Sequence, residues 1–422
     1  MARPLVGRRG SVLPLPGMVP AYPLFLLLGA GSALFVGMID PIIAVYYVQV
    51  VGLGPLQLVL LGTVVEIAGL ICEVPTGVVA DLYSRRLSVI IGVVAVGVCF
   101  VVQGLLPFVV AIVAAEALRG IGRTFTSGAL EAWIADEIGE GPAAGAYLRY
   151  AQVRQIGALA GTVAGVGLAA FALSLPVVIG GLGMLLLGAC LAVVMPERHF
   201  VPARHHAQQG LRSAWGTFKH GLTELGRRPL LGTLMGLWLV LGFSTEGLDR
   251  LWEAHLLANF RLPTIGQLNP VFWFGAINVA FMVLSVVANE IARRWVDLTD
   301  DVAVARALAV TCLLRIAGVL LFGLAIGFAP AVLGYLTTEV FRRVSQPLFT
   351  GWVNRHVDPR VRATLLSMGG EVDAIGQLTG GPAIGLVAQL LSLRAAMVAV
   401  GLTLVPALPL LVRARRQASE KP

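Results

Sequence analysis

Charged residues, and lysine above all, are scarce in this chain of 422 residues. Only 13 % of the residues are charged, against about 25 % in soluble domains. The sequence has two lysines, Lys219 and Lys421, and neither follows a glycine. A phosphate-binding loop of the form GxxxxGK[ST] is therefore impossible. The composition excludes an ordinary soluble protein, and the missing loop excludes a pump that carries its own P-loop ATPase.

Cysteine is also scarce and is never clustered. The four cysteines each stand alone inside an apolar run: Cys72, Cys99, Cys190 and Cys312. Without a CxxC pair or a Cys/His cluster, we expect neither a disulfide framework nor a metal site. The sequence also lacks an HExxH zinc motif and a GxSxG nucleophile motif. We therefore expect no cofactor and no enzymatic activity.

Long apolar runs take the place of the missing charge. Hydrophobic residues make up 57 % of the chain, and the mean hydropathy is +0.85. Because a bilayer crossing needs about 20 mostly apolar residues, the chain reads as an all-α membrane protein. Hydropathy predicts twelve transmembrane helices, which cover 22–48, 57–80, 87–106, 109–135, 148–171, 176–195, 230–254, 271–291, 303–327, 330–353, 365–390 and 395–412. We expect two six-helix bundles.

The loops between these spans predict the domain organisation and the orientation. The expected segments are 1–21 as a cytoplasmic N-terminus, 22–195 and 230–412 as bundles, 196–229 as a cytoplasmic central loop, and 413–422 as a cytoplasmic tail. In the loops predicted on the opposite side of the membrane, the only basic residues are Arg261 and Arg394. Because cytoplasmic loops are rich in Lys and Arg, both termini are predicted to be cytoplasmic in a multi-pass protein of the cell membrane. The net charge of +8 then reflects topology and anionic lipid, not nucleic acid.

Two weaker patterns accompany this organisation. Apolar residues at 211, 215, 218, 222 and 225 predict an amphipathic helix on the inner leaflet, with a solvated linker as the alternative. At one constant offset in the numbering, the first half of the chain matches the second at four positions, which suggests an internal repeat: Arg123 with Arg342, Trp133 with Trp352, Gly157 with Gly376, and Gly161 with Gly380.

Three carboxylates inside the spans are candidates for proton coupling. An ionisable residue near the bilayer centre costs about 2.5–3.5 kcal/mol, so it usually faces a cavity or a partner. Glu66 and Glu73 lie on one stripe of the second span, and Glu66 has no arginine within four residues on its own helix. Asp40 precedes Pro41, which should kink the first span and free a carbonyl group.

Two charged stripes are candidates for the wall of a substrate cavity. The fourth span carries one of them, and the seventh carries the other at helical spacing. Their members are Glu116, Arg119, Arg123, Glu246, Asp249 and Arg250. The alternative is that these are structural ion pairs that set the rotation of each helix. His255, which follows the second stripe, is expected at the membrane interface.

The loop after the second span resembles the signature loop of the major facilitator superfamily. It reads Gly77-Val-Val-Ala-Asp81-Leu-Tyr-Ser-Arg85-Arg86, although Leu and Ser stand where that family usually has Arg and Gly. The resemblance implies a cytoplasmic gate formed by Gly77, Asp81, Arg85 and Arg86. In that gate Asp81 would cap a helix and pair across the cytoplasmic face.

Glycine spacing in two later spans adds to this resemblance. Gly157-x3-Gly161-x3-Gly165 in the fifth span looks like the glycine-rich motif of the drug/proton antiporter branch, without its proline. Gly376-x3-Gly380-Gly-Pro in the eleventh span is closer to that motif but lies in the other half. The alternative for both is tight helix packing, which small-x3-small spacing favours.

Together these features predict a secondary active transporter that works by alternating access. The resemblance implies proton-coupled export of small amphipathic molecules by a monomer. Proton-coupled uptake of a nutrient or organic anion, with Arg119 and Arg123 as ligands, is the first alternative. A membrane enzyme or lipid-handling protein without ion coupling is the second.

Overall fold

The computed structural model describes residues 20–202, 229–264, 271–357 and 359–419. Over these residues the secondary structure consists of helices joined by short connections. The first half contains α1 (Ala21–Tyr46), the π-helical turn η1 (Tyr47–Val51), α2 (Pro55–Leu82), α3 (Arg85–Leu105), α4 (Val109–Thr126), α5 (Ala129–Ile138), α6 (Glu140–Ala169) and α7 (Ser174–Val194). The second half contains α9 (Pro229–Asn259), α10 (Phe272–Trp295), α11 (Asp301–Leu324), α12 (Phe328–His356), α13 (Pro359–Leu390), α14 (Leu393–Leu404) and α15 (Ala407–Ser419). The predicted amphipathic helix and most of the predicted N-terminal segment lie outside the described residues.

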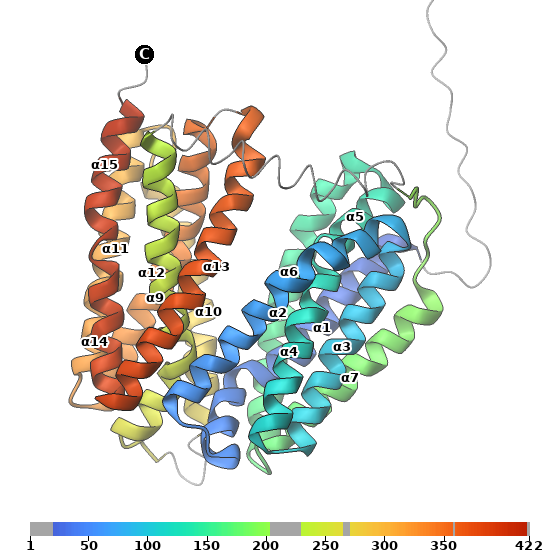
Figure 1. The fold of residues 1–422 in the computed structure, drawn as a ribbon, viewed down its shortest axis with the longest axis horizontal. Helices are drawn as coiled ribbons and strands as arrows, with labels where there is room; N and C mark the ends of the chain where they lie inside the picture. Colours follow the sequence, from blue (N-terminus) through green and yellow to red (C-terminus); the bar gives the residue numbers. More distant parts are fainter. Residues whose placement is uncertain (1–19, 203–228, 265–270, 358, 420–422) are drawn as a thin grey trace, which may run out of the picture.

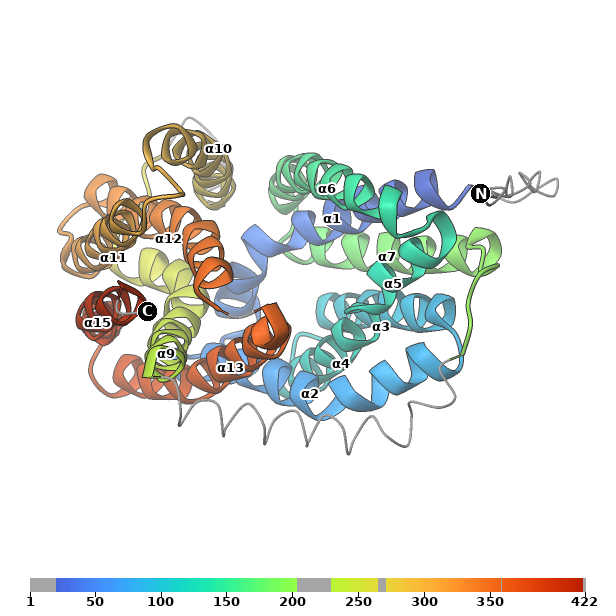
Figure 2. The ribbon, with the colours of Figure 1, turned by 90° about the horizontal axis from the view of Figure 1, so that it is seen from above.

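The helices form two bundles, one from each half of the chain (Figure 1). Seen from above, the bundles lie side by side (Figure 2). Figure 1 shows that they meet at one end and diverge at the other, where the C-terminus lies. With α1–η1, α4–α5 and α14–α15 each taken as one crossing, the described helices make the twelve predicted crossings, and the predicted fold is confirmed.

The crossings differ in how apolar they are. Among the described residues, eight helices are long and apolar enough to cross a membrane. The other four crossings are α4–α5, α6, α12 and α13, and each of them contributes charged side chains to the central cavity described below. These four crossings combine a membrane-spanning length with a polar face.

Two crossings are broken where the sequence predicts continuous helices. The fourth is interrupted at Ser127 and Gly128, and Gly128 adopts a φ of 72°, a left-handed conformation that favours glycine. The twelfth is interrupted at 405–406, where Pro406 has no N–H to continue the helical hydrogen bonds. The prediction of single helices over 109–135 and 395–412 is corrected on this point.

Pro41 lies inside α1, and the helix continues through it into η1. Because proline has no N–H, the carbonyl of Gly37, four residues earlier, loses its helical donor. The hydroxyl of Thr162 in α6 donates to this carbonyl at 3.5 Å. The freed carbonyl expected from the sequence is therefore satisfied by the neighbouring helix.

The glycine motifs pack α6 against α1 and α13 against α9. A Cβ atom on Gly161 would lie 2.2 Å from the carbonyl oxygen of Leu34, and one on Gly380 would lie 2.1 Å from that of Phe243. Only glycine allows backbones to approach this closely. The packing interpretation of both motifs is confirmed, and the matched glycines of the two halves have the same role in the two bundles.

A shared apolar cluster joins the bundles at the end where they meet. Ile42 and Leu58 of the first bundle pack in one buried cluster with Leu248 and Ile384 of the second. The open end has a different character, because there the bundles enclose a polar cavity.

Candidate functional site

A cavity of about 1560 Å³ lies between the two bundles. It is larger than the roughly 300–1,000 Å³ of typical small-molecule pockets. Its lining comes from α1, α2, α3, α4, α5, α6 and α7 of the first bundle and from α10, α12 and α13 of the second. Eleven charged side chains line it: Asp40, Glu66, Glu73, Arg119, Arg123, Glu131, Arg154, Glu290, Arg293, Arg343 and Glu371.

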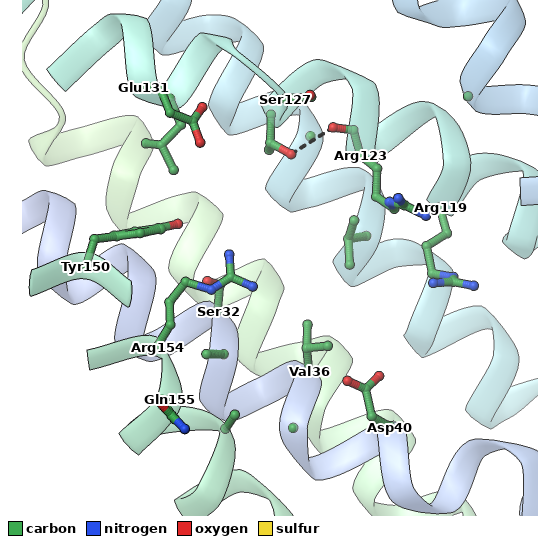
Figure 3. Close-up of a pocket in the computed structure, with 18 of the residues that line it drawn as sticks. Ser32, Val36, Asp40, Arg119, Arg123, Ser127, Glu131, Tyr150, Arg154 and Gln155 are labelled. Carbon is green, nitrogen blue, oxygen red and sulfur yellow. Dashed lines mark hydrogen bonds between the residues drawn. The ribbon is translucent and has the colours of Figure 1, made fainter. Parts of the chain in front are cut away.

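Asp40 faces this cavity from α1, and its side chain lies on the same side as Arg119 of α4 (Figure 3). The residue is exposed to the cavity. Within the described parts of the chain, its carboxylate has no hydrogen bond or ion pair, although the charges of Arg119, Arg154 and Arg250 attract it. Asp40 is thus an acid held among cations and directly paired with none.

Glu66 and Glu73 line the cavity from α2. Glu66 accepts from Arg123 of α4 across 3.4 Å, so its arginine partner comes from a neighbouring helix. Glu73 is exposed to the cavity about two turns further along α2. Of the three predicted proton-coupling residues, Glu66 is therefore paired.

Glu116 lies behind the cavity wall. It is 2 % exposed and accepts hydrogen bonds from Tyr47 and Gln103, each at 2.8 Å. Arg119 donates to its other oxygen at 2.8 and 2.5 Å, and the guanidinium also reaches the cavity. Glu116 thus positions Arg119, and of these two only Arg119 borders the cavity.

The charged stripe on α9 lies at the contact between the bundles, outside the cavity lining. Arg250 donates to Glu246 at 2.8 Å, and this ion pair packs directly over Gly62 of α2. Asp249 pairs with Arg342 of α12 at 2.9 Å. The structure thus places these three predicted cavity residues in ion pairs at, or directly behind, the contact between the two bundles.

A buried acid beside these ion pairs, Glu339 of α12, was not predicted. Glu339 is 2 % exposed and accepts from Arg342 at 2.6 Å, next to the buried Arg315. His255 is fully buried, and its Nε2 lies 3.2 Å from the carbonyl oxygen of Phe322. The ring of His255, which was expected at the membrane interface, is enclosed by protein and packs against the rings of Phe260 and Phe322.

The signature loop makes its contacts within the first bundle. Arg85 pairs with Asp136 of α5 and lies 3.9 Å from Asp81, and the backbone N–H of Arg86 donates to Glu197 at 3.0 Å. Asp81 is exposed in the last turn of α2, and the N-cap of α3 is Ser84, which accepts from the N–H of Leu87. The expectation that Asp81 caps a helix is corrected.

Gly77 adds the remaining member of the predicted gate. A Cβ atom there would meet nothing within 4 Å. Gly77 lies within α2, before the loop, and faces open space at its Cβ position.

The fold and the enclosed polar cavity define a multi-pass membrane protein of the transporter class. The family model described as Major Facilitator Superfamily matches residues 25–369. The chain belongs to this superfamily.

Its relatives include an uncharacterized MFS-type transporter, YxaM, of Bacillus subtilis (strain 168). That protein is 23 % identical over 359 residues, which cover 83 % of this chain and 85 % of the relative. Among solved structures, a bacterial homologue of the human lysosomal transporter Spinster, inward-facing and unoccupied, is similar with a TM-score of 0.73 and 14 % identity, covering 95 % of this chain and 97 % of that one. A mutant of the nucleoside transporter NupG is similar with a TM-score of 0.74 and 13 % identity, covering 93 % and 99 %. These structures establish the shared fold.

Proposed function

We propose that this protein is a proton-coupled exporter of small amphipathic molecules that works by alternating access. It acts as a monomer in the cell membrane with both termini in the cytoplasm. The cavity then opens to the cytoplasm in the state described, because the bundles diverge at the end where the C-terminus lies (Figure 1).

The observation that carries the proposal is the position of Asp40. It faces the central cavity without a direct partner among the described residues, whereas Glu66, Glu116 and Glu246 are each bound to an arginine. An acid without a fixed counterion can gain and lose a proton without breaking an ion pair. Asp40 therefore takes up a proton from outside, and the opening toward the cytoplasm lets it release the proton there.

The driving force is adequate for export. One charge that moves through 100 mV supplies about 2.3 kcal/mol. Because about 1.4 kcal/mol corresponds to a tenfold ratio, one proton per cycle supports an accumulation of roughly fiftyfold.

A proteoliposome screen tests the proposal. Vesicles with an imposed pH gradient and a lumenal pH dye are exposed to hydrophobic amines, organic anions and neutral compounds. At least one compound should collapse the gradient with the wild-type protein, and Asp40→Asn should abolish this response. Glu290→Gln is the matched control, because Glu290 also lines the cavity but is bound by Arg293 and Arg294. A silent panel, or equal responses from wild type and Asp40→Asn, would contradict proton coupling through Asp40.

Inside-out vesicles separate export from uptake. An export substrate accumulates when their lumen is acidified, whereas the substrate of a proton symporter does not. A membrane enzyme or lipid-handling protein without ion coupling would keep its activity, independent of any pH gradient, in both Asp40→Asn and Glu66→Gln.

A further inference from the structure

Two arginines face the cavity from opposite bundles without a carboxylate partner. They are Arg154 of α6 and Arg343 of α12. Each other arginine in the lining is bound by an acid: Arg119 by Glu116, Arg123 by Glu66 and Arg293 by Glu290. Across the described part of the chain, no carboxylate lies within ion-pair distance of Arg154 or Arg343. Their charges remain available to a ligand.

Both guanidinium groups are held by an aromatic ring. Arg154 lies 5.7 Å from the ring centre of Tyr150, and Arg343 lies 5.4 Å from that of Phe281. Tyr150 is itself stacked on Phe25 at 4.3 Å. Cation–π contacts of this kind attract a guanidinium group to a ring without neutralising its charge. Each arginine therefore has an aromatic neighbour and keeps its full charge for a ligand.

The two arginines also lie at a similar depth in the molecule. Arg154 lies about four helical turns after Glu140, the first residue of α6, and Arg343 lies about four turns before His356, the last residue of α12. Both of these helix ends lie at the open end of the molecule (Figure 1). At about 1.5 Å per residue, each guanidinium is attached about 20 Å below the mouth. Figure 3 shows Arg154 directed into the cavity beside Ser32.

We propose that Arg154 and Arg343 form an anion subsite that binds the carboxylate of an amphipathic organic substrate between the two bundles. Guanidinium groups suit this task because they donate paired hydrogen bonds to a carboxylate. Asp40 lies deeper, about five turns along α1 from Ala21, and is left to carry the proton. The inference rests on the proposed transport function and names the class of its substrate.

Equilibrium binding in detergent, without any gradient, tests the subsite. The probes are three fluorescent amphipaths that share a dansyl group: dansylglycine, its neutral methyl ester and the cationic dansylcadaverine. The wild-type protein should bind dansylglycine at least about tenfold more tightly than the ester, because a hydrogen bond to a charged group is lost in the ester. Arg154→Gln and Arg343→Gln should each remove most of this preference, and Arg154→Lys should retain part of it.

Arg149→Gln is the matched control, because Arg149 lies on the same helix, outside the cavity lining, and donates to Gln152. If both arginines contact one carboxylate, the double variant should lose less than the sum of the two single losses. Equal affinity for dansylglycine and its ester, or a preference unchanged in both glutamine variants, would overturn the subsite.

The binding result is independent of proton coupling. A protein that prefers dansylglycine but shows no gradient response would refute the coupling and leave the subsite standing. A gradient response without a preference for dansylglycine would refute the subsite and leave the proton coupling standing.

Discussion

Gly62 of α2 lies directly against the Glu246–Arg250 ion pair of the other bundle, at the end where the bundles meet. A Cβ atom on Gly62 would lie 1.6 Å from Oε1 of Glu246 and 2.6 Å from Nε of Arg250. Glu246 is 5 % exposed, so the displaced carboxylate has little room to move. The substitution Gly62→Ala should therefore destabilise this closed end by about 1–3 kcal/mol, the usual cost of overpacking. In a protein with two states, that energy shifts the equilibrium about 5- to 150-fold toward the state that opens there.

Gly69→Ala is the matched control on the same helix. Its added methyl group would meet only the γ-methyl of Thr124, at 3.9 Å. Both substitutions gain the same helix propensity relative to glycine, about 1 kcal/mol. The difference between them therefore isolates the contact with the ion pair.

Spin-label distances measure the shift directly. Labels are attached at Tyr83→Cys and Trp295→Cys, in a protein whose four native cysteines are replaced. These positions are 72 % and 84 % exposed and lie at the ends of α2 and α10. In lipid nanodiscs, Gly62→Ala should move the distance distribution toward shorter values as the open end closes. Identical distributions for Gly62→Ala and wild type would show that the contact at Gly62 does not set how closely the bundles approach.

Two further substitutions test the packing and the buried charge. Gly161→Val should lower the melting temperature in detergent strongly or prevent folding, because its Cβ would lie 2.2 Å from the carbonyl oxygen of Leu34. Gly167→Val is the control on the same helix. Its Cβ meets nothing within 4 Å, so its melting temperature should change much less. Glu116→Gln should cost about 1.5–3 kcal/mol, because Arg119 loses its charge-assisted hydrogen bonds to Glu116 but still faces the cavity. An unchanged melting temperature would show that the pair contributes no net stability.

The sequence predicts the crossings well because hydropathy is a property of each segment alone. For most helix ends, the predicted span limit differs from the observed end by only a few residues. The glycine motifs pack as small-x3-small spacing predicts. The break at Gly128 was not predicted, because glycine is also common inside membrane helices and only its φ of 72° shows its role.

The site was harder to predict because its pairs join different helices. Glu66 has no arginine on its own helix, and only the packing of α4 on α2 brings Arg123 to it. The sequence alone could not distinguish Arg154 and Arg343 from other arginines. What sets them apart is that they line the cavity without an ion-pair partner among the described residues. Asp40 was predicted from its place beside Pro41, and the structure places it in the cavity.

Substrate exchange, compared with gradient-driven accumulation, tests whether Asp40 carries the coupled proton. In proteoliposomes, exchange of labelled for unlabelled substrate needs no net proton movement, whereas accumulation against a gradient does. If Asp40 carries the proton, Asp40→Asn should keep exchange near the wild-type rate and lose accumulation driven by a pH gradient. An Asp40→Asn protein that accumulates substrate as the wild type does would contradict this role of Asp40.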